Sequence, residues 1–151
     1  MKIGVLIFVA FLSGAVLAAR AADNGIITKA SKYSVEVTMD RFEAAAKKRG
    51  FTILARIDHG KAAAKAGLKL RPSQLLIFGN PKGGTPIMAA APTAGLDLPL
   101  KALAWEDASG RVWLSYNSST WLKARHDIED ADKPLAGMSK ALSAMADTAV
   151  Q

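Results

Sequence analysis

The segment that decides the fold is Gln74-Leu75-Leu76-Ile77-Phe78-Gly79-Asn80-Pro81-Lys82-Gly83-Gly84-Thr85-Pro86, an apolar run that ends abruptly at glycines and prolines. The run from Leu75 to Phe78 predicts a central strand that is buried on both faces of a sheet. The glycines and prolines after it predict a loop with special backbone conformations at one end of that strand. The rest of the chain is then expected to supply sheet partners for this strand and helices that cover it.

The segments around this run show the patterns of further strands and helices. Apolar and polar residues alternate in four of them, which predicts strands at 33–38, 51–58, 100–106 and 111–117. Capping residues and helical spacing predict helices over 40–49, with Asp40 as N-cap, over 59–66, after Ser118 and from Pro134 onward. Residues 23–32 are interpreted as a polar lead-in. These elements predict a single α+β domain with a mostly antiparallel sheet and helices packed mainly on one face.

The amino terminus has the layout of a secretory signal peptide. Lys2 precedes an apolar run over 3–12, and small residues then lead to Ala19-Arg20-Ala21, which resembles a cleavage site. The uncharged span 3–19 is short for crossing a bilayer, although a retained anchor is the alternative. We therefore predict that residues 1–22 are removed and that the protein is periplasmic or secreted, without membrane contact after cleavage.

Composition and charge exclude several classes of function. The chain has 151 residues, enough for one domain with a core, and its net charge of +7 falls to +5 when the signal peptide is removed. The basic run Lys47-Lys48-Arg49 is interpreted as a solvated helix end, so no nucleic-acid partner is predicted. The chain has no cysteine, which excludes disulfides, thiolate metal sites and thiol catalysis.

A series of short motifs follows in order along the chain: Arg56-Ile57-Asp58-His59, Leu70-Arg71-Pro72, Leu76-Ile77-Phe78-Gly79-Asn80-Pro81, Gly84-Thr85-Pro86-Ile87-Met88, Gly95-Leu96-Asp97-Leu98-Pro99-Leu100-Lys101, Trp105-Glu106-Asp107, Val112-Trp113-Leu114-Ser115-Tyr116 and Arg125-His126. Together they resemble the family called domain of unknown function 302, and we assign residues 33–150 to it. The resemblance implies a compact fold of strand, helix, four strands and helix. It also implies a homodimer, because family members often form dimers. It implies no agreed biochemical activity.

The glycine-rich segment after the predicted central strand is the first candidate site. Successive backbone N–H groups in such a loop can cradle an anion, and Lys82 would add positive charge. The alternative is a tight connection in which glycine only permits the turn, since the segment is neither a P-loop nor a dinucleotide fingerprint. The candidate ligand-binding residues are Gly79, Asn80, Gly84, Thr85, Asp97 and His126.

Asp97, His126 and His59 are the candidate catalytic residues, because a carboxylate and an imidazole that converge can perform acid–base chemistry. Asp97 lies in a loop between Gly95 and Pro99, where it could equally hydrogen-bond its own backbone. No Gly-x-Ser-x-Gly nucleophile motif is present. Metal-ligand spacing such as H-E-x-x-H is also absent, so we predict neither a metal nor a cofactor.

Three functions remain open at this point. The first is a binding module for a small, anionic or amphipathic ligand near residues 79–88. The second is an enzyme that uses a carboxylate and a histidine. The third is a structural homodimer in which tryptophans such as Trp105 and Trp113 fill the interface, although these residues could also form core or a pocket wall.

Overall fold

The structure is a computed structural model that describes residues 24–151. The predicted signal peptide, residues 1–22, lies outside the described residues. Within the described part of the chain, no helix is both long and apolar enough to cross a membrane.

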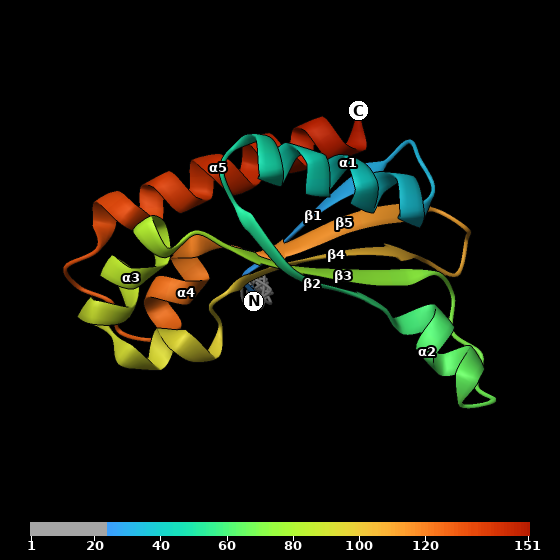
Figure 1. The fold of residues 1–151 in the computed structure, drawn as a ribbon, viewed down its shortest axis with the longest axis horizontal. Helices are drawn as coiled ribbons and strands as arrows, with labels where there is room; N and C mark the ends of the chain where they lie inside the picture. Colours follow the sequence, from blue (N-terminus) through green and yellow to red (C-terminus); the bar gives the residue numbers. More distant parts are fainter. Residues whose placement is uncertain (1–23) are drawn as a thin grey trace, which may run out of the picture.

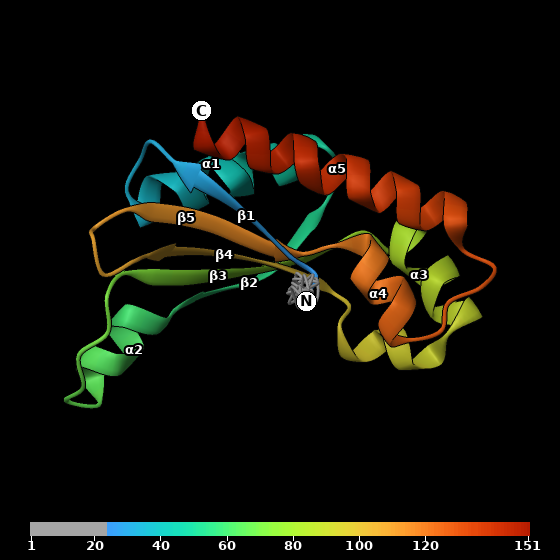
Figure 2. The same cartoon turned by 180° about the vertical axis from the view of Figure 1, so that it is seen from behind.

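The described chain forms one α+β domain, as predicted. Its elements are β1 (Ile26–Ser31), α1 (Val35–Lys48), β2 (Thr52–Asp58), α2 (His59–Lys65), β3 (Ser73–Gly79), α3 (Pro81–Ala90), the 3-10 helix η1 (Pro92–Leu96), β4 (Leu100–Glu106), β5 (Val112–Asn117), α4 (Ser119–Arg125) and α5 (Asp132–Val150). The strands form an antiparallel sheet in the order β1-β5-β4-β3-β2. Helices α1 and α5 lie side by side on one face of this sheet (Figures 1 and 2). Helices α3 and α4 gather with η1 at one end of the molecule, and α2 projects from the other end (Figure 1).

The first strand and the first helix begin at other residues than predicted. β1 lies within the segment interpreted as a lead-in, and α1 begins at Val35, inside the segment predicted as a strand. Ser34 is the N-cap of α1, and its side chain accepts a hydrogen bond from the backbone N–H of Val37 at 3.3 Å. The alternation over 33–38 was too short to distinguish the residue period of a strand from that of a helix, because Val35 also starts a helical stripe. The buried residues of this stripe are Val35, Thr38, Met39, Phe42, Ala45 and Ala46.

Asp40 is therefore not a helix cap, and the prediction that it begins a helix was wrong. It lies inside α1, where its Oδ1 atom is 2.5 Å from Nη1 of Arg56 on β2. Glu43 lies one turn further along the same helix, and its Oε2 atom is 3.4 Å from the same nitrogen. The spacing that resembled a capping box instead places two carboxylates on one helix face, where they hold β2 against α1.

β3 is an interior strand, but it is covered on one face only. Leu76 and Phe78 point toward the helices and are fully buried, whereas Leu75 and Ile77 on the opposite face are half-buried. The prediction of burial on both faces was wrong, because the sheet is antiparallel and both long helices cover the same face. β4, rather than β3, is the central strand of the sheet.

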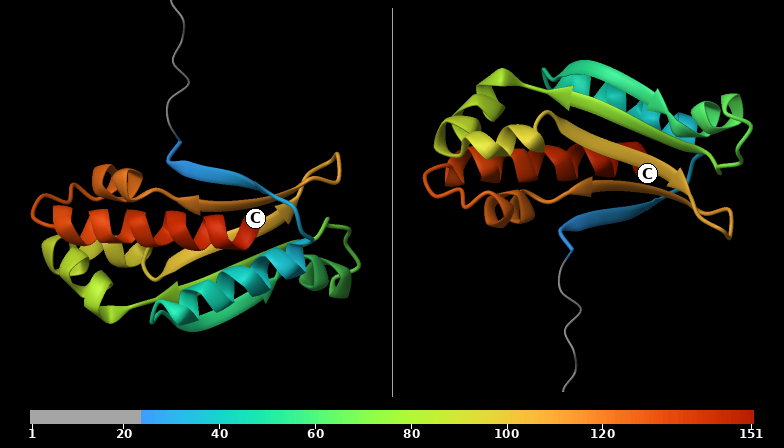
Figure 3. Two further views of the ribbon diagram at one scale, coloured as in Figure 1. Left: turned by 90° about the horizontal axis from the view of Figure 1, so that it is seen from above. Right: turned by 90° about the horizontal axis from the view of Figure 1, so that it is seen from below.

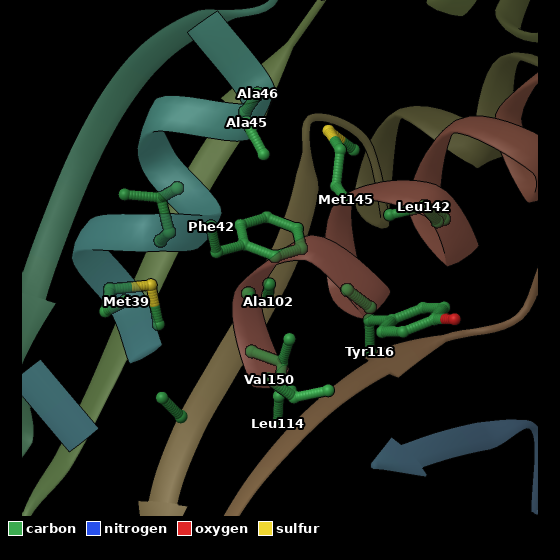
Figure 4. Close-up of a cluster of buried hydrophobic side chains, with 14 of the residues drawn as sticks. Met39, Phe42, Ala45, Ala46, Ala102, Leu114, Tyr116, Leu142, Met145 and Val150 are labelled. Carbon is green, nitrogen blue, oxygen red and sulfur yellow. The ribbon is translucent and has the colours of Figure 1, made fainter. Parts of the chain in front are cut away.

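The main core lies between α1, α5 and the covered face of the sheet (Figure 4). Phe42 of α1 packs edge-on against Phe78 of β3, with ring centroids 5.3 Å apart. Leu142 and Met145 of α5 close the core from the neighbouring helix. A second, smaller core joins α3, η1, α4 and the start of α5 around Ile87. This second core holds together the end of the molecule where the candidate site lies.

Asp107 organises the turn between β4 and β5, at the end of the sheet away from α3 and α4 (Figure 1). Its Oδ1 atom accepts hydrogen bonds from the Ser109 side chain and from the backbone N–H groups of Ser109 and Arg111, and its Oδ2 atom accepts one from the Trp113 indole. The Ser109 hydroxyl, followed by the Trp113 indole, holds the pKa of the Asp107 carboxyl well below its usual range. Gly110 takes the left-handed conformation in this turn, with φ of 80°. Asp107 thus shapes a turn.

Candidate functional site

An open cavity of about 510 Å³ lies at the end of the sheet that is next to α3 and the N-terminal half of α5. Its walls come from the start of β2, the end of β3, most of α3, the segment 98–100 and the N-terminal half of α5. α3 lies next to that half of α5, while α1 ends nearby (Figure 3, left). The lining is almost wholly apolar, with Phe51, Met88 and Met138 among its larger side chains. This is the composition of a site for an apolar small molecule.

Glycines, which have no side chain, create part of this space. Gly79, Gly83, Gly84 and Gly137 all line the cavity. A Cβ atom at Gly83 or Gly137 would meet no atom within 4 Å, and a Cβ at Gly84 would lie 3.9 Å from the Leu98 side chain. Larger side chains would therefore fit at these positions but would occupy the cavity. Glycine costs about 0.5–1 kcal/mol in a helix relative to alanine, so two glycines in α3 and one in α5 weaken helices that border the space.

The segment predicted to be an anion-binding loop is instead the start of α3. Asn80 is the N-cap and Pro81 is the first helical residue, a common combination at helix starts. The Asn80 side chain accepts from the backbone N–H of Lys82 at 3.0 Å. The backbone carbonyl oxygen of Asn80 accepts hydrogen bonds from the N–H groups of Gly83 and Gly84 at 3.0 and 2.9 Å. The amides expected to cradle an anion therefore bond within the chain, which matches the tight-connection alternative.

The six predicted ligand-binding residues fall into two groups. Gly79, Asn80, Gly84 and Thr85 line the cavity. Asp97 and His126 do not line it but meet each other in a second cluster between η1 and α4, described below. Their role in ligand binding stays a prediction. The contribution of α5 was not predicted, although an isolated glycine inside a predicted helix, such as Gly137, signals a special packing position.

Asp97 and His126 form a hydrogen-bonded row with Thr93. His126 Nε2 lies 2.6 Å from Asp97 Oδ2, and His126 Nδ1 lies 3.0 Å from the Thr93 hydroxyl. Nε of Arg125 lies 3.0 Å from the same Asp97 oxygen. The His126 side chain is only 4% exposed, so the row ties η1 firmly to α4. Its chemical order of hydroxyl, imidazole and carboxylate is also that of a nucleophile with its base.

His59, the third candidate catalytic residue, is not part of this row. It is the first residue of α2, which projects from the opposite end of the molecule (Figure 1). Among residues 24–151, no group of three histidine, aspartate or glutamate side chains lies close enough to hold a metal ion.

A family model described as "Domain of unknown function DUF302" matches residues 27–145 of the chain. The chain belongs to this family. A crystal structure of an uncharacterized conserved DUF302 protein from Bacillus stearothermophilus has the same fold, with a TM-score of 0.75 and 20% sequence identity. The likeness covers 85% of this chain and 99% of that one.

Longer proteins also contain a segment similar to this DUF302 domain. A fluoride-specific ion channel, FluC 1, of Brucella suis is 50% identical over 106 residues, which are 70% of this chain and 42% of the channel protein. FluC 1 of Brucella abortus has the same identity over the same length, which is 39% of that protein. The chain therefore matches less than half the length of these curated relatives.

Proposed function

We propose that this DUF302 domain binds a small, predominantly apolar molecule in the cavity beside α3 and α5. The cavity itself supports this most directly. Its volume of about 510 Å³ falls within the range of roughly 300–1,000 Å³ that is usual for small-molecule sites. Protein interiors are otherwise closely packed, so a space of this size that is walled by apolar side chains and glycine favours an occupant.

Catalysis by the Asp97–His126 row is less well supported than binding. The row does not border the cavity, so a molecule held there would not lie against the Thr93 hydroxyl or the His126 ring. Arg125 already neutralises the Asp97 carboxylate that would stabilise an imidazolium during proton transfer. We therefore assign the row a structural role, in which it fixes η1 beside the second core.

The similarity to Brucella proteins does not supply the ligand. Those relatives are named as fluoride-specific ion channels, and the chain matches 39–42% of their length. A small anion requires N–H donors, and the first amides of α3 bond to Asn80 instead. We propose a ligand other than fluoride for the cavity. From the predicted signal peptide, we also propose that the domain acts in the periplasm or outside the cell.

The binding proposal predicts that filling the cavity from α5 abolishes binding. Gly137→Phe should place a ring in the cavity, because Gly137 lines it and no atom lies within 4 Å of a Cβ at this position. Titration with the neutral fluorophore N-phenyl-1-naphthylamine should give saturable binding to the wild type and at least a tenfold loss in the variant. Ala136→Phe is the matched control, since Ala136 is exposed on the same helix and does not line the cavity. Wild-type protein that does not bind the probe, or a folded Gly137→Phe variant that binds it normally, would contradict the proposal.

The uncovered face of the sheet favours a second function, which is homodimer formation. Trp105 and Trp113 stack on this face with ring centroids 6.4 Å apart, and no helix within residues 24–151 lies across it (Figure 3, right). Five strands about 4.8 Å apart and about 20 Å long present roughly 500 Å² per copy. Two copies would then bury roughly 1,000 Å², the lower bound for a specific interface.

Helix α2 and the segment after it would enlarge this interface. None of the α2 residues is buried, and the following Leu68 and Leu70 are 67% and 55% exposed. We propose that these leucines pack against the uncovered sheet face of a second copy. Light scattering should give the mass of a dimer for the wild type and of a monomer for the double variant Leu68→Lys/Leu70→Lys. Leu96→Lys is the control, because Leu96 is 75% exposed at the opposite end of the domain. A wild-type monomer would end the dimer proposal.

A further inference from the structure

We infer that the ligand of the cavity is an anionic amphiphile, whose chain enters the cavity while its head group stays among lysines at the opening. This inference rests on the proposed binding function and adds the chemical class of the ligand. It is argued from the arrangement of residues on α5 and from the charges that surround the opening.

Helix α5 presents different kinds of residue on its different faces. Pro134, Met138 and Ala141 repeat at helical spacing and face the cavity, while Leu135 and Leu142 on the adjoining side are buried in the two cores. The glycine at 137 lies on the other side of this stripe, is exposed to solvent, and still lines the cavity. Gly137 therefore marks the opening of the cavity along α5.

Two lysines flank Gly137 on this side of the helix. Lys133 lies four residues before it and Lys140 three residues after it, so both share the face of α5 on which Gly137 lies. Both are exposed, and neither forms an ion pair or a side-chain hydrogen bond with another residue of the described chain. The missing side chain at 137 leaves a notch between two free ammonium groups.

Other cations adjoin the cavity lining, and the acidic residues of α1 and α5 nearest to it are already paired. Lys48 and Arg49 end α1 just before Phe51, and both are exposed without an ion pair in the described chain. Glu43 of α1 is paired with Lys47 and Arg56, and Asp132 at the start of α5 is paired with Lys123. Among the side chains without an ion pair in the described chain, these four cations (Lys48, Arg49, Lys133 and Lys140) outnumber the exposed Glu129 and Asp130 of the loop before α5. The balance near the opening is therefore positive, which favours an anionic head group over a neutral or cationic one.

The cavity wall explains why the rest of the ligand should be apolar. The polar side chains that line it are Thr52, Asn80 and Thr85, and Asn80 already bonds to the Lys82 amide and the Gly50 carbonyl. A charged group moved inside would lose its hydration and would find only the hydroxyls of Thr52 and Thr85 as side-chain donors in exchange. The head group must therefore remain at the opening, where it can interact with the lysines and with water.

The test compares four ligands that share one chain: decanoate, decyl phosphate, decanol and decylamine. Each is titrated below its aggregation concentration, by displacement of N-phenyl-1-naphthylamine from the full mature protein at low and high salt. Wild-type protein should bind the two anions more tightly than decylamine, and this preference should shrink at high salt because exposed charges are screened. The ratio between decanoate and decyl phosphate then distinguishes a carboxylate ligand from a phosphate ligand.

The variant Lys133→Gln/Lys140→Gln should weaken decanoate and decyl phosphate binding by about fivefold and leave decanol binding unchanged. The control Lys65→Gln/Lys69→Gln removes the same charge at the opposite end of the domain and should change neither. Equal effects on anions and decanol, or no effect on either, would overturn the inference while leaving the binding function intact. If the wild type binds neither the fluorophore nor decanol, the binding function is overturned instead, and the inference with it.

Discussion

Replacing Phe42 with alanine is expected to lower the free energy of unfolding by about 3–5 kcal/mol, the largest stability effect of any single core truncation considered for this domain. Phe42 is fully buried at the point where α1, α5 and the sheet meet (Figure 4). Its ring contacts Phe78 edge-on, and Phe78 in turn contacts Phe51, with centroids 5.6 Å apart. Because Phe51 also lines the cavity, the truncation should loosen one wall of the proposed site.

Urea unfolding followed by circular dichroism measures this effect. Domains of this kind have a total stability of about 5–15 kcal/mol, so the variant should lose a large share of it and unfold at much lower urea concentration. Val37→Ala is the control, because Val37 is on the same helix but 42% exposed, and its truncation should cost well under 1 kcal/mol. Similar midpoints for the two variants would show that α1 does not pack on the sheet as described.

Gly25→Ala is expected to destabilise the domain by about 2–4 kcal/mol. Gly25 precedes β1 with φ of 73°, and a Cβ atom there would lie 2.2–2.3 Å from the Cβ, Cγ and Cδ1 atoms of Trp121. These atoms are close to the Trp121 backbone, so the side chain cannot move away without shifting α4. The Gly25 carbonyl also accepts a hydrogen bond from the Ser118 N–H at 2.7 Å, which fixes the start of β1 against the cap of α4.

Gly50→Ala separates the steric part of this effect from the backbone part. Gly50 has almost the same φ, 76°, but a Cβ there would meet nothing within 4 Å. Gly50→Ala should therefore lose only the stability associated with a left-handed backbone at alanine, about 1 kcal/mol. The two variants are compared by thermal unfolding under identical conditions. Equal losses of stability would mean that Trp121 does not pack against Gly25.

Local patterns in the sequence were enough to predict most of the regular structure. The strands β4 and β5 and the helix α5 were all predicted, because each depends on residues close together in the chain. β1 was missed because its inward positions include Lys29 and Ser31, which are polar. Lys29 pairs with Asp147 of α5, and Ser31 hydrogen-bonds Thr38 of α1. These partners are distant in sequence or lie on another element, so no alternation of apolar residues marks the strand.

The place of the segment after Phe78 in the fold was predicted from the sequence, but its backbone conformation was not. The segment after Phe78 does lie at the end of an interior strand, close to Pro99. Its glycines and prolines were interpreted as a loop, because Gly83, Gly84 and Pro86 all disfavour helix. The cap at Asn80 and the packing of Ile87 in the second core outweigh these propensities, and the backbone amides are satisfied within α3.

By itself, the sequence determined which segments alternate, which form amphipathic helices and where turns occur, because those properties arise within a few residues. Only the tertiary structure decided that the glycines of α3 and α5 face a common space, and that Asp97 and His126 meet outside it. Part of the cavity arises because Gly84 and Gly137, more than 50 residues apart, have no side chains and are brought together by the packing of α3 against α5. A cavity formed between distant segments leaves no local pattern in the sequence, so the apolar lining of this cavity becomes apparent only in the folded chain.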